Sequence, residues 1–235
     1  MKRWIKFHLE LCGKAVSLAA ALLLLQNISP SAFADSALDE LVAKMQQKYE
    51  NLDSLKADFT QSYESKRFSD HLVEKGVVYF HKGGLMKWLY NEPEKKVFLS
   101  DGVFYSYYVE DDKQLVKVPV QENDDQRSPA LFLAGRGNFQ RDFRAEWSDP
   151  RPGSHLVKLV PLKPQPDFAY LIVDVDPVRG LIQRLVVVDE YDNRTDYTFL
   201  DIQENPPLPS NFFAFQPPPG TDIIYQRGDA TEGVE

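Results

Sequence analysis

The sequence predicts an α+β fold in which one large, strongly twisted or curled antiparallel sheet carries two or three short amphipathic helices. Three observations support this prediction. From residue 75 onward, short apolar runs alternate with turn signals, as is typical of consecutive antiparallel strands. Helical spacing of apolar residues is confined to short segments. No internal repeat and no shift in composition indicates a second folded domain.

The first 34 residues are expected to be a signal peptide. A mostly basic segment, MKRWIKFHLELCGK, precedes the apolar run AVSLAAALLLL, which is too short to span a bilayer comfortably. Ala32 and Ala34 supply the small side chains of a cleavage site, so the mature chain should begin at Asp35; an uncleaved anchor is the alternative. The predicted organisation is a signal peptide at 1–34, one domain at 35–226 and a disordered tail at 227–235.

Charge and cysteine content exclude several classes of function. The chain has 27 Lys and Arg against 35 Asp and Glu, and loss of the leader leaves 23 against 34, a net charge near −11. Such a charge disfavours binding to nucleic acid and to anionic lipid surfaces. The only cysteine, Cys12, precedes the apolar run, so it is not the acylated cysteine of a lipoprotein signal. The mature chain therefore has no disulfide and no thiol chemistry.

The helices are expected near the N-terminus and in the middle of the chain. Ser36 can cap a helix over 36–51, with Asp39 at its third position. Pro129 opens the short helix PALFLAG, and a second helical or irregular piece follows it. Apolar residues recur at helical spacing in the first helix: Leu38, Leu41, Val42, Met45, Tyr49 and Leu52.

The strands fall into two groups. LKADFTQSYE precedes an expected antiparallel meander of five, whose joints include Gly83-Gly84 and the hairpin signal Asp101-Gly102. The meander consists of KGVVYFHK, LMKWLYN, KKVFLSD, VFYSYYVE and KQLVKVPV. The second group consists of SHLVKLVPL, FAYLIVDVD, GLIQRLVVVDEY and RTDYTFLDIQE, and a Pro-rich crossing leads to a last short strand, DIIYQ.

No catalytic, metal or cofactor motif stands out. His71, His81 and His155 are far apart and lack metal-ligand spacing, so no metal and no cofactor is expected. The sequence contains no nucleophile elbow, no P-loop and no dinucleotide fingerprint after a strand. We predict that the protein is not an enzyme; an exported hydrolase is the alternative, which activity on esters or glycosides would reveal.

The predicted hairpin GVVYFHKGGLMKWLYNEP at 76–93 is apolar on both faces, whereas a half-buried hairpin alternates apolar and polar residues. A core on both sides of the sheet would explain this pattern. However, the two predicted helices are too few to cover so wide a sheet. A curled sheet roofed by short helices would instead leave a cavity.

Seven segments, in this order, resemble the periplasmic outer-membrane lipoprotein carriers of the LolA family over almost the whole mature chain. They are LKADFTQ, the spacing G(x)11W(x)4P at Gly76, Trp88 and Pro93, then SDGVFYSYY, SPALFLAG, LVKLVPL, LVVVDEYDNRTDYTFLDIQEN and FFAFQPPPGTDI. The resemblance implies an incomplete, half-open antiparallel β-barrel with short helices forming a lid over a hydrophobic cavity. It implies a monomeric periplasmic chaperone that takes triacylated lipoproteins from an ABC-type inner-membrane complex to an outer-membrane acceptor.

The resemblance also assigns the apolar hairpin face. By strand alternation, Val78, Phe80 and Lys82 share one face, and Met86, Trp88 and Tyr90 share one face of the partner strand. In the family, the positions matching Met86 and Trp88 line the acyl cavity. The predicted lipid-binding residues are Met45, Tyr49, Leu52, Val78, Phe80, Met86, Trp88, Tyr90, Leu131 and Phe132.

Lys82 is the candidate lid latch. Family members usually have Arg at this position, commonly followed by Pro, and that Arg ties the lid to the barrel through helix backbone. Lys offers a point charge in place of a planar fork, so a weaker latch and a solvated turn residue are both open. The alternative function is a periplasmic regulator of similar fold that senses lipids or lipoproteins, which would usually bring a second domain.

Overall fold

The computed structural model describes residues 30–66, 71–120, 129–149, 151 and 153–226. The chain divides into two compact units, residues 1–37 and 38–235. In the first unit only residues 30–37 are described, as the start of a helix. The strands and the other helices belong to the second unit. None of the helices in these ranges is long and apolar enough to cross a membrane.

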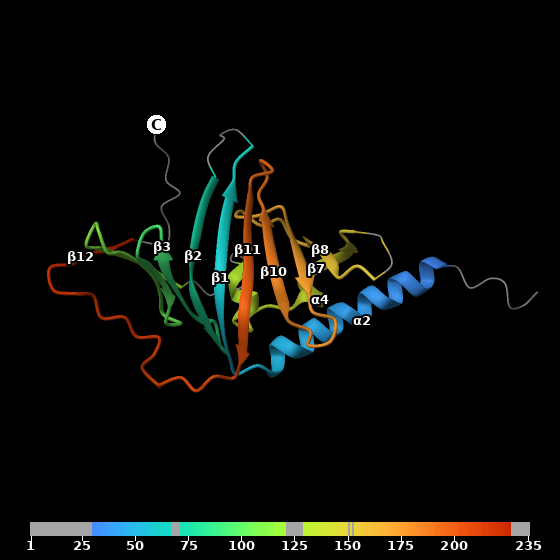
Figure 1. The fold of residues 1–235 in the computed structure, drawn as a ribbon, viewed down its shortest axis with the longest axis horizontal. Coiled ribbons are helices and arrows are strands. Elements are labelled where there is room, and N and C mark those ends of the chain that lie inside the picture. The colour runs from blue at the N-terminus through green and yellow to red at the C-terminus, as the bar shows by residue number, and fades with distance from the viewer. Residues whose placement is uncertain (1–29, 67–70, 121–128, 150, 152, 227–235) are drawn as a thin grey trace, which may run out of the picture. The chain divides into compact units, whose positions relative to one another are not determined.

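A sheet of twelve strands forms most of the second unit (Figure 1). The strands are β1 Ser54–Glu64, β2 His71–His81, β3 Leu85–Glu92, β4 Lys96–Ser100, β5 Phe104–Val109, β6 Gln114–Pro119, β7 Phe143–Trp147, β8 Leu156–Pro161, β9 Tyr170–Val175, β10 Ile182–Val188, β11 Arg194–Glu204 and β12 Asp222–Tyr225. Their order in the sheet is β12-β6-β5-β4-β3-β2-β1-β11-β10-β9-β8-β7.

The sheet is open, because β12 and β7 lie at its two ends and do not pair with each other in the described part of the chain. Strands β2 to β6 follow one another as antiparallel neighbours, which confirms the predicted five-stranded meander. The predicted half-open antiparallel barrel is also confirmed. One strand departs from this pattern, because β12 pairs with β6 in parallel.

Two glycine turns explain the local course of the meander. Gly83 and Gly84 join β2 to β3 with φ of 91° and 86°, and Gly102 joins β4 to β5 with φ of 85°. Residues with a side chain rarely adopt such positive φ angles, so glycine suits these tight connections. These turns fix the register that places Val78 opposite Trp88 and Phe80 opposite Met86.

Strand β1 lies at the centre of the sheet, between β2 and β11. Its pairing with β11 joins the two strand groups, with Phe59 opposite Phe199. Leu55, Ala57 and Phe59 are all buried, and residues two apart in a strand point to the same face. This face is the one that the helices cover.

Three helices are described: α2 Pro30–Asn51, α3 Pro129–Leu133 and α4 Phe139–Asp142. The prediction that α2 begins at Ser36 is wrong, because the helix begins at Pro30. Proline is favoured in the first turn of a helix, and the residues between the two positions include no glycine or second proline that would end it. The helical or irregular piece expected after α3 is the short helix α4, which is followed directly by strand β7.

The Pro-rich segment 206–221, here called the strap, leads from β11 to β12 (Figure 1). Its aromatic side chains contact Tyr79, which alternates with the buried Val78 and Phe80 on β2, and Tyr108, which does not share a face with Tyr105, the β5 residue that packs against the interior cluster. They therefore cover the face opposite the helices. The ring centroids of Phe212 and Tyr79 are 4.7 Å apart, and those of Phe215 and Tyr108 are 5.2 Å apart. The strap thereby supplies the second apolar layer on this side of the sheet.

Candidate functional site

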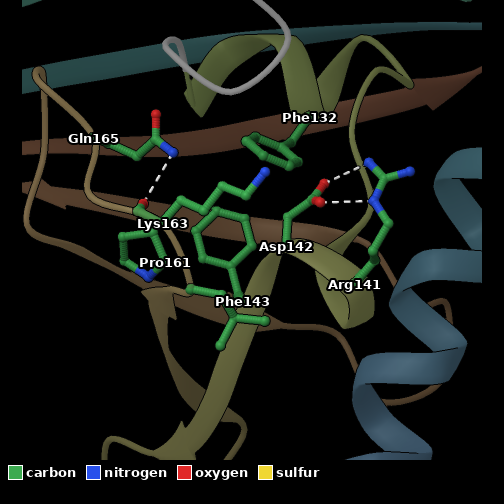
Figure 2. Close-up of a pocket in the computed structure, with 8 residues that line it drawn as sticks. Phe132, Arg141, Asp142, Phe143, Pro161, Lys163 and Gln165 are labelled. Carbon is green, nitrogen blue, oxygen red and sulfur yellow. Dashed lines mark hydrogen bonds and ion pairs between the residues drawn. The ribbon is translucent and has the colours of Figure 1, made fainter.

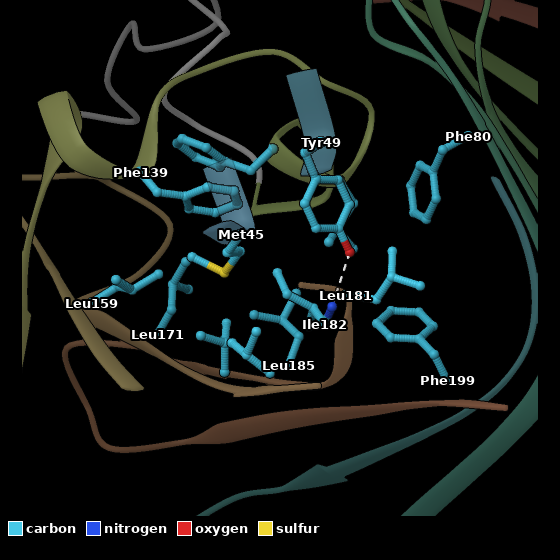
Figure 3. Close-up of a cluster of buried hydrophobic side chains, with 14 of the residues drawn as sticks. Met45, Tyr49, Phe80, Phe139, Leu159, Leu171, Leu181, Ile182, Leu185 and Phe199 are labelled. Atoms are coloured by element: carbon cyan, nitrogen blue, oxygen red, sulfur yellow. Dashed lines mark hydrogen bonds between the residues drawn. The ribbon is translucent and has the colours of Figure 1, made fainter. Parts of the chain in front are cut away.

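The interior beneath the helices is an apolar cluster in which α2 packs against both halves of the sheet (Figure 3). Met45 and Tyr49 point from α2 into this cluster and are 0% and 4% exposed. They meet Leu181 and Ile182 at the start of β10 and Phe139 of α4. A period near 3.6 residues places Met45, Tyr49 and Leu52 on one side of the helix end, which is why this side is buried.

An aromatic group centred on Trp88 forms the wall of the interior on the hairpin side. The Trp88 ring lies 5.0 Å from Phe59 and 5.5 Å from Phe80, both edge-on, and 5.4 Å from Tyr197 across the curled sheet. Edge-on aromatic pairs are favoured by the charge distribution of the rings. The Trp88 Nε1 atom is buried without a hydrogen-bond partner among the described residues. A buried donor in this situation costs about 1–3 kcal/mol, which a ligand oxygen could recover.

The structure brings nearly all of the predicted lipid-binding residues together. Tyr90 is partly buried and packs against the cluster, with its hydroxyl donating to Gln61 Oε1 at 2.9 Å. The side chain of Leu131 lies outside the described residues. The remaining predicted residues are buried in the one cluster: Met45, Tyr49, Leu52, Val78, Phe80, Met86, Trp88 and Phe132.

Lys82 connects the hairpin tip to the end of α2. Its Nζ donates to the carbonyl of Glu50 at 2.9 Å, and its backbone N–H donates to the carbonyl of Asp53 at 2.9 Å. The last carbonyls of a helix have no partner within the helix and carry partial negative charge, so a lysine there is favourable. On the other side of the tip, the Gly84 N–H donates to the Ala134 carbonyl, just after α3, at 3.2 Å. The hairpin tip therefore holds both helices.

Two buried hydrogen bonds also fix α2, and the sequence pattern did not indicate them. Gln46, 7% exposed, accepts from the Phe139 N–H of α4 at 2.8 Å through Oε1. Its Nε2 donates to Glu50 at 2.7 Å. The Tyr49 hydroxyl accepts from the Ile182 N–H at 3.2 Å, and burial raises the pKa of this phenol, which stays neutral. In the sequence, only the position of Gln46, a polar residue directly after Met45 on the buried side of the helix, indicates that its amide must find a partner inside the protein.

A pocket of about 290 Å³ lies where α3, α4 and the end of β8 meet (Figure 2). Its apolar side is formed by Phe132 and Phe143, which also belong to the interior cluster. At its rim, hydrogen bonds from Arg141 hold the pKa of the Asp142 carboxyl below its ordinary value. Close to Lys82, by contrast, the crevice between the hairpin and α2 has a volume of only about 10 Å³. The predicted lining residues are thus packed against one another, with the helices closed over them.

A polar groove of about 450 Å³ lies on the other side of α2. Lys48 and Arg179 both bind Glu204, at 2.9 and 2.8 Å, and these hydrogen bonds lower the pKa of its carboxyl. The Lys44 ammonium donates to the Pro177 carbonyl at 2.6 Å. These contacts tie α2 to β11 and to the β9–β10 turn. Within the described ranges, no three His, Cys, Asp or Glu side chains gather in a way that could hold a metal ion.

Comparisons with known proteins place the chain in a family. Two curated relatives are outer-membrane lipoprotein carrier proteins. That of Nitrosomonas europaea is 27% identical over 73% of this chain and 82% of the relative. That of Bordetella avium is 29% identical over 89% of this chain and 97% of the relative.

A crystal structure of an uncharacterized conserved protein from Thermus thermophilus shares the fold, with a TM-score of 0.50 and 16% identity over 80% of this chain and 98% of that one. The family model described as "Outer membrane lipoprotein carrier protein LolA" matches residues 50–216. This match covers Lys82, the aromatic wall and most of the strap, and the chain belongs to the LolA family of outer membrane lipoprotein carrier proteins.

Proposed function

We propose that this protein binds the acyl chains of triacylated lipoproteins in its apolar interior and carries them between the two membranes of the cell envelope. The observation that carries the proposal is the convergence of the predicted lining residues into one cluster beneath helices that are attached by a few hydrogen bonds. Family membership supports the same role, because the relatives are named as lipoprotein carriers.

The energetics of acyl chains explain why such a carrier needs a lid. Burial of one CH₂ group is worth about 0.8 kcal/mol, so three long chains cannot cross water unshielded. The same energy would make a rigid, perfectly fitting pocket a trap that never releases its cargo. When no cargo is bound, the side chains of the interior pack against one another. Loading must replace these contacts, so the net binding free energy of the acyl chains is smaller. Met45 and Met86 suit this exchange, since methionine repacks easily.

The proposed route follows from the predicted leader and from the family. Export with removal of the leader before Asp35 would place the protein in the periplasm. There it would act as a monomer, taking cargo from an ABC-type complex of the inner membrane and passing it to an acceptor at the outer membrane. This role requires no cofactor and no catalytic step.

The substitution Met86→Glu tests the proposal, because Met86 is 0% exposed at the centre of the predicted lining. A carboxylate there would face acyl chains without a partner, which is costly. We expect a protein that folds, as judged by circular dichroism, but fails to release lipoproteins from inner-membrane vesicles. The matched control is Leu200→Glu, because Leu200 is 55% exposed. Unchanged loading by a natively folded Met86→Glu protein would refute acyl binding at this site.

A further inference from the structure

The inner face of β1 and β2 forms a track that leads away from the helices. Residues two apart share a face, and the distance along the track from Leu55 to Gln61 is about 20 Å at about 3.3 Å per residue. Five cross-strand pairs line the track. Only one of them, the fourth in order, is polar, because it joins an amide side chain to a carboxylate. In order along the track, the pairs are Leu55–Phe80, Ala57–Val78, Phe59–Gly76, Gln61–Glu74 and Tyr63–Leu72.

The fourth pair belongs to a connected polar group, here called the polar stop, made of Gln61, Glu74, Tyr90 and Lys96. The Lys96 ammonium forms an ion pair with Glu74 Oε1, and Gln61 Nε2 donates to Glu74 Oε2 at 3.1 Å. The Tyr90 hydroxyl donates to Gln61 Oε1 at 2.9 Å, and Lys96 Nζ lies 4.7 Å from the centre of the Tyr90 ring. Each member of the group is thus engaged by another.

The ion pair in the polar stop is largely shielded from solvent although it carries two full charges. Glu74 is 4% exposed, and the side chain of Lys96 is 14% exposed. Burial and the nearby Glu74 carboxylate raise the pKa of Tyr197 to about 12, so the charge acts on the neighbouring aromatic wall. Replacing a buried ion pair by apolar residues is often neutral or stabilising. Stability alone therefore does not explain an ion pair on an otherwise apolar surface.

We propose that the polar stop ends the acyl-binding track and so limits the length of chain that the interior accepts, an inference that rests on the proposed function. A chain reaching beyond Phe59 would lie against two charges and would separate them from the partners that satisfy them. Beyond the polar stop the track turns apolar again, with Tyr63 and Leu72 40% and 47% exposed. Without the charges, the apolar surface would continue into this region.

The test measures affinity for lysophosphatidylcholines of increasing acyl length by calorimetry, each below its micelle concentration. In the parent protein, each added CH₂ should tighten binding about fourfold, the equivalent of about 0.8 kcal/mol, until a length beyond which the affinity stays constant. In the double variant Glu74→Leu/Lys96→Leu, this plateau should move to longer chains. Both proteins carry the same net charge, so a general electrostatic change is avoided.

The chain offers a matched control in Lys75→Leu/Glu92→Leu. This pair joins the same strand β2 to its neighbour β3, at 3.3 Å, but its side chains are 57% and 66% exposed. Its plateau should equal that of the parent. Should the first double variant fail to unfold cooperatively in urea, Glu74→Met/Lys96→Met carries the same test with unbranched side chains.

The inference would be overturned if a folded polar-stop variant reached its plateau at the same acyl length as the parent. It would also be overturned if the affinity of the parent rose with every added CH₂ and reached no plateau. Failure of the parent to bind any chain length would overturn it too. Lipoprotein loading by the parent and by Met86→Glu decides the carrier function separately, so the two proposals can fail independently.

Discussion

Lys82 is an exposed side chain whose ammonium donates to a carbonyl of α2, and we predict that this contact helps to hold the lid closed. Because water competes for this ammonium, we expect its bond to Glu50 to be worth about 1 kcal/mol, which is less than a buried charged hydrogen bond contributes. Lys82→Leu should then favour the open form roughly fivefold, so that cargo loads normally but is transferred less well to the outer-membrane acceptor. Lys82→Arg should transfer at least as well as the parent, since its fork can make two bonds.

The control for this prediction is Lys95→Leu, which removes an exposed lysine in the β3–β4 turn. Its transfer should match that of the parent. Equal transfer by the Leu, Lys and Arg forms at position 82 would mean that Lys82 is a solvated turn residue whose contact has no functional weight.

Gln46 makes the second contact that we expect to stabilise the closed form, and this contact lies inside the domain. Gln46→Leu would leave the buried N–H of Phe139 without its acceptor, at a cost of about 1–3 kcal/mol. We expect the midpoint of urea unfolding to fall, with the slope unchanged. The neighbouring Gln47 is exposed, so Gln47→Leu should leave the midpoint within error. Equal midpoints for both variants would show that water replaces the lost acceptor.

At the scale of elements, the strap stabilises the meander from outside. Lys87 lies between the two, because its Nζ donates to the Phe212 carbonyl at 3.2 Å and lies 4.8 Å from the centre of the Phe212 ring. Burial lowers the pKa of this lysine. Phe213 is 7% exposed and contacts His81, with ring centroids 5.9 Å apart. The strap is therefore part of the folded domain and not a loose connection.

Phe213→Ala should destabilise the protein by about 3 kcal/mol, because it removes a buried ring from this layer. For a domain of this size, the thermal midpoint should fall by on the order of 10 °C. Val103→Ala, at a side chain that is 62% exposed, is the control and should shift the midpoint little. A fall of similar size in both variants would argue against a specific role of the strap.

At the scale of the whole molecule, the sequence predicts where the strands lie but only in part which strands pair with each other. Turn residues such as Gly83 and Gly102 specify local hairpins, so the meander follows from sequence. The parallel pairing of β12 with β6 joins Ile223 to Leu115, and no local pattern encodes a contact over such a separation. The start of α2 was predicted wrongly because Ser36 is a residue type that often caps helices. The residues before it are also compatible with a helix.

The candidate site was predictable to the extent that apolar alternation marks it. Val78, Phe80, Met86 and Trp88 alternate with residues of the outer face and lie together as expected. Gln46 was not predicted, because its partner is a backbone N–H that only the packing of α4 brings near. The assignment of the apolar face to acyl chains came from the family resemblance, since alternation alone does not separate a binding surface from an ordinary core.

The pairing of β1 with β11 has a consequence for how the chain acquires its fold. Thr60 pairs with Thr198, so the middle of the sheet cannot form until most of the polypeptide has been made. Contacts over such distances must first overcome the entropy of closing a long loop, and proteins rich in them fold in milliseconds to seconds. Stopped-flow refolding should therefore be slow, with β1 protected from hydrogen exchange only when β11 is. On the proposed route of export, a chain with this delay would still be unfolded when it is threaded through a membrane pore.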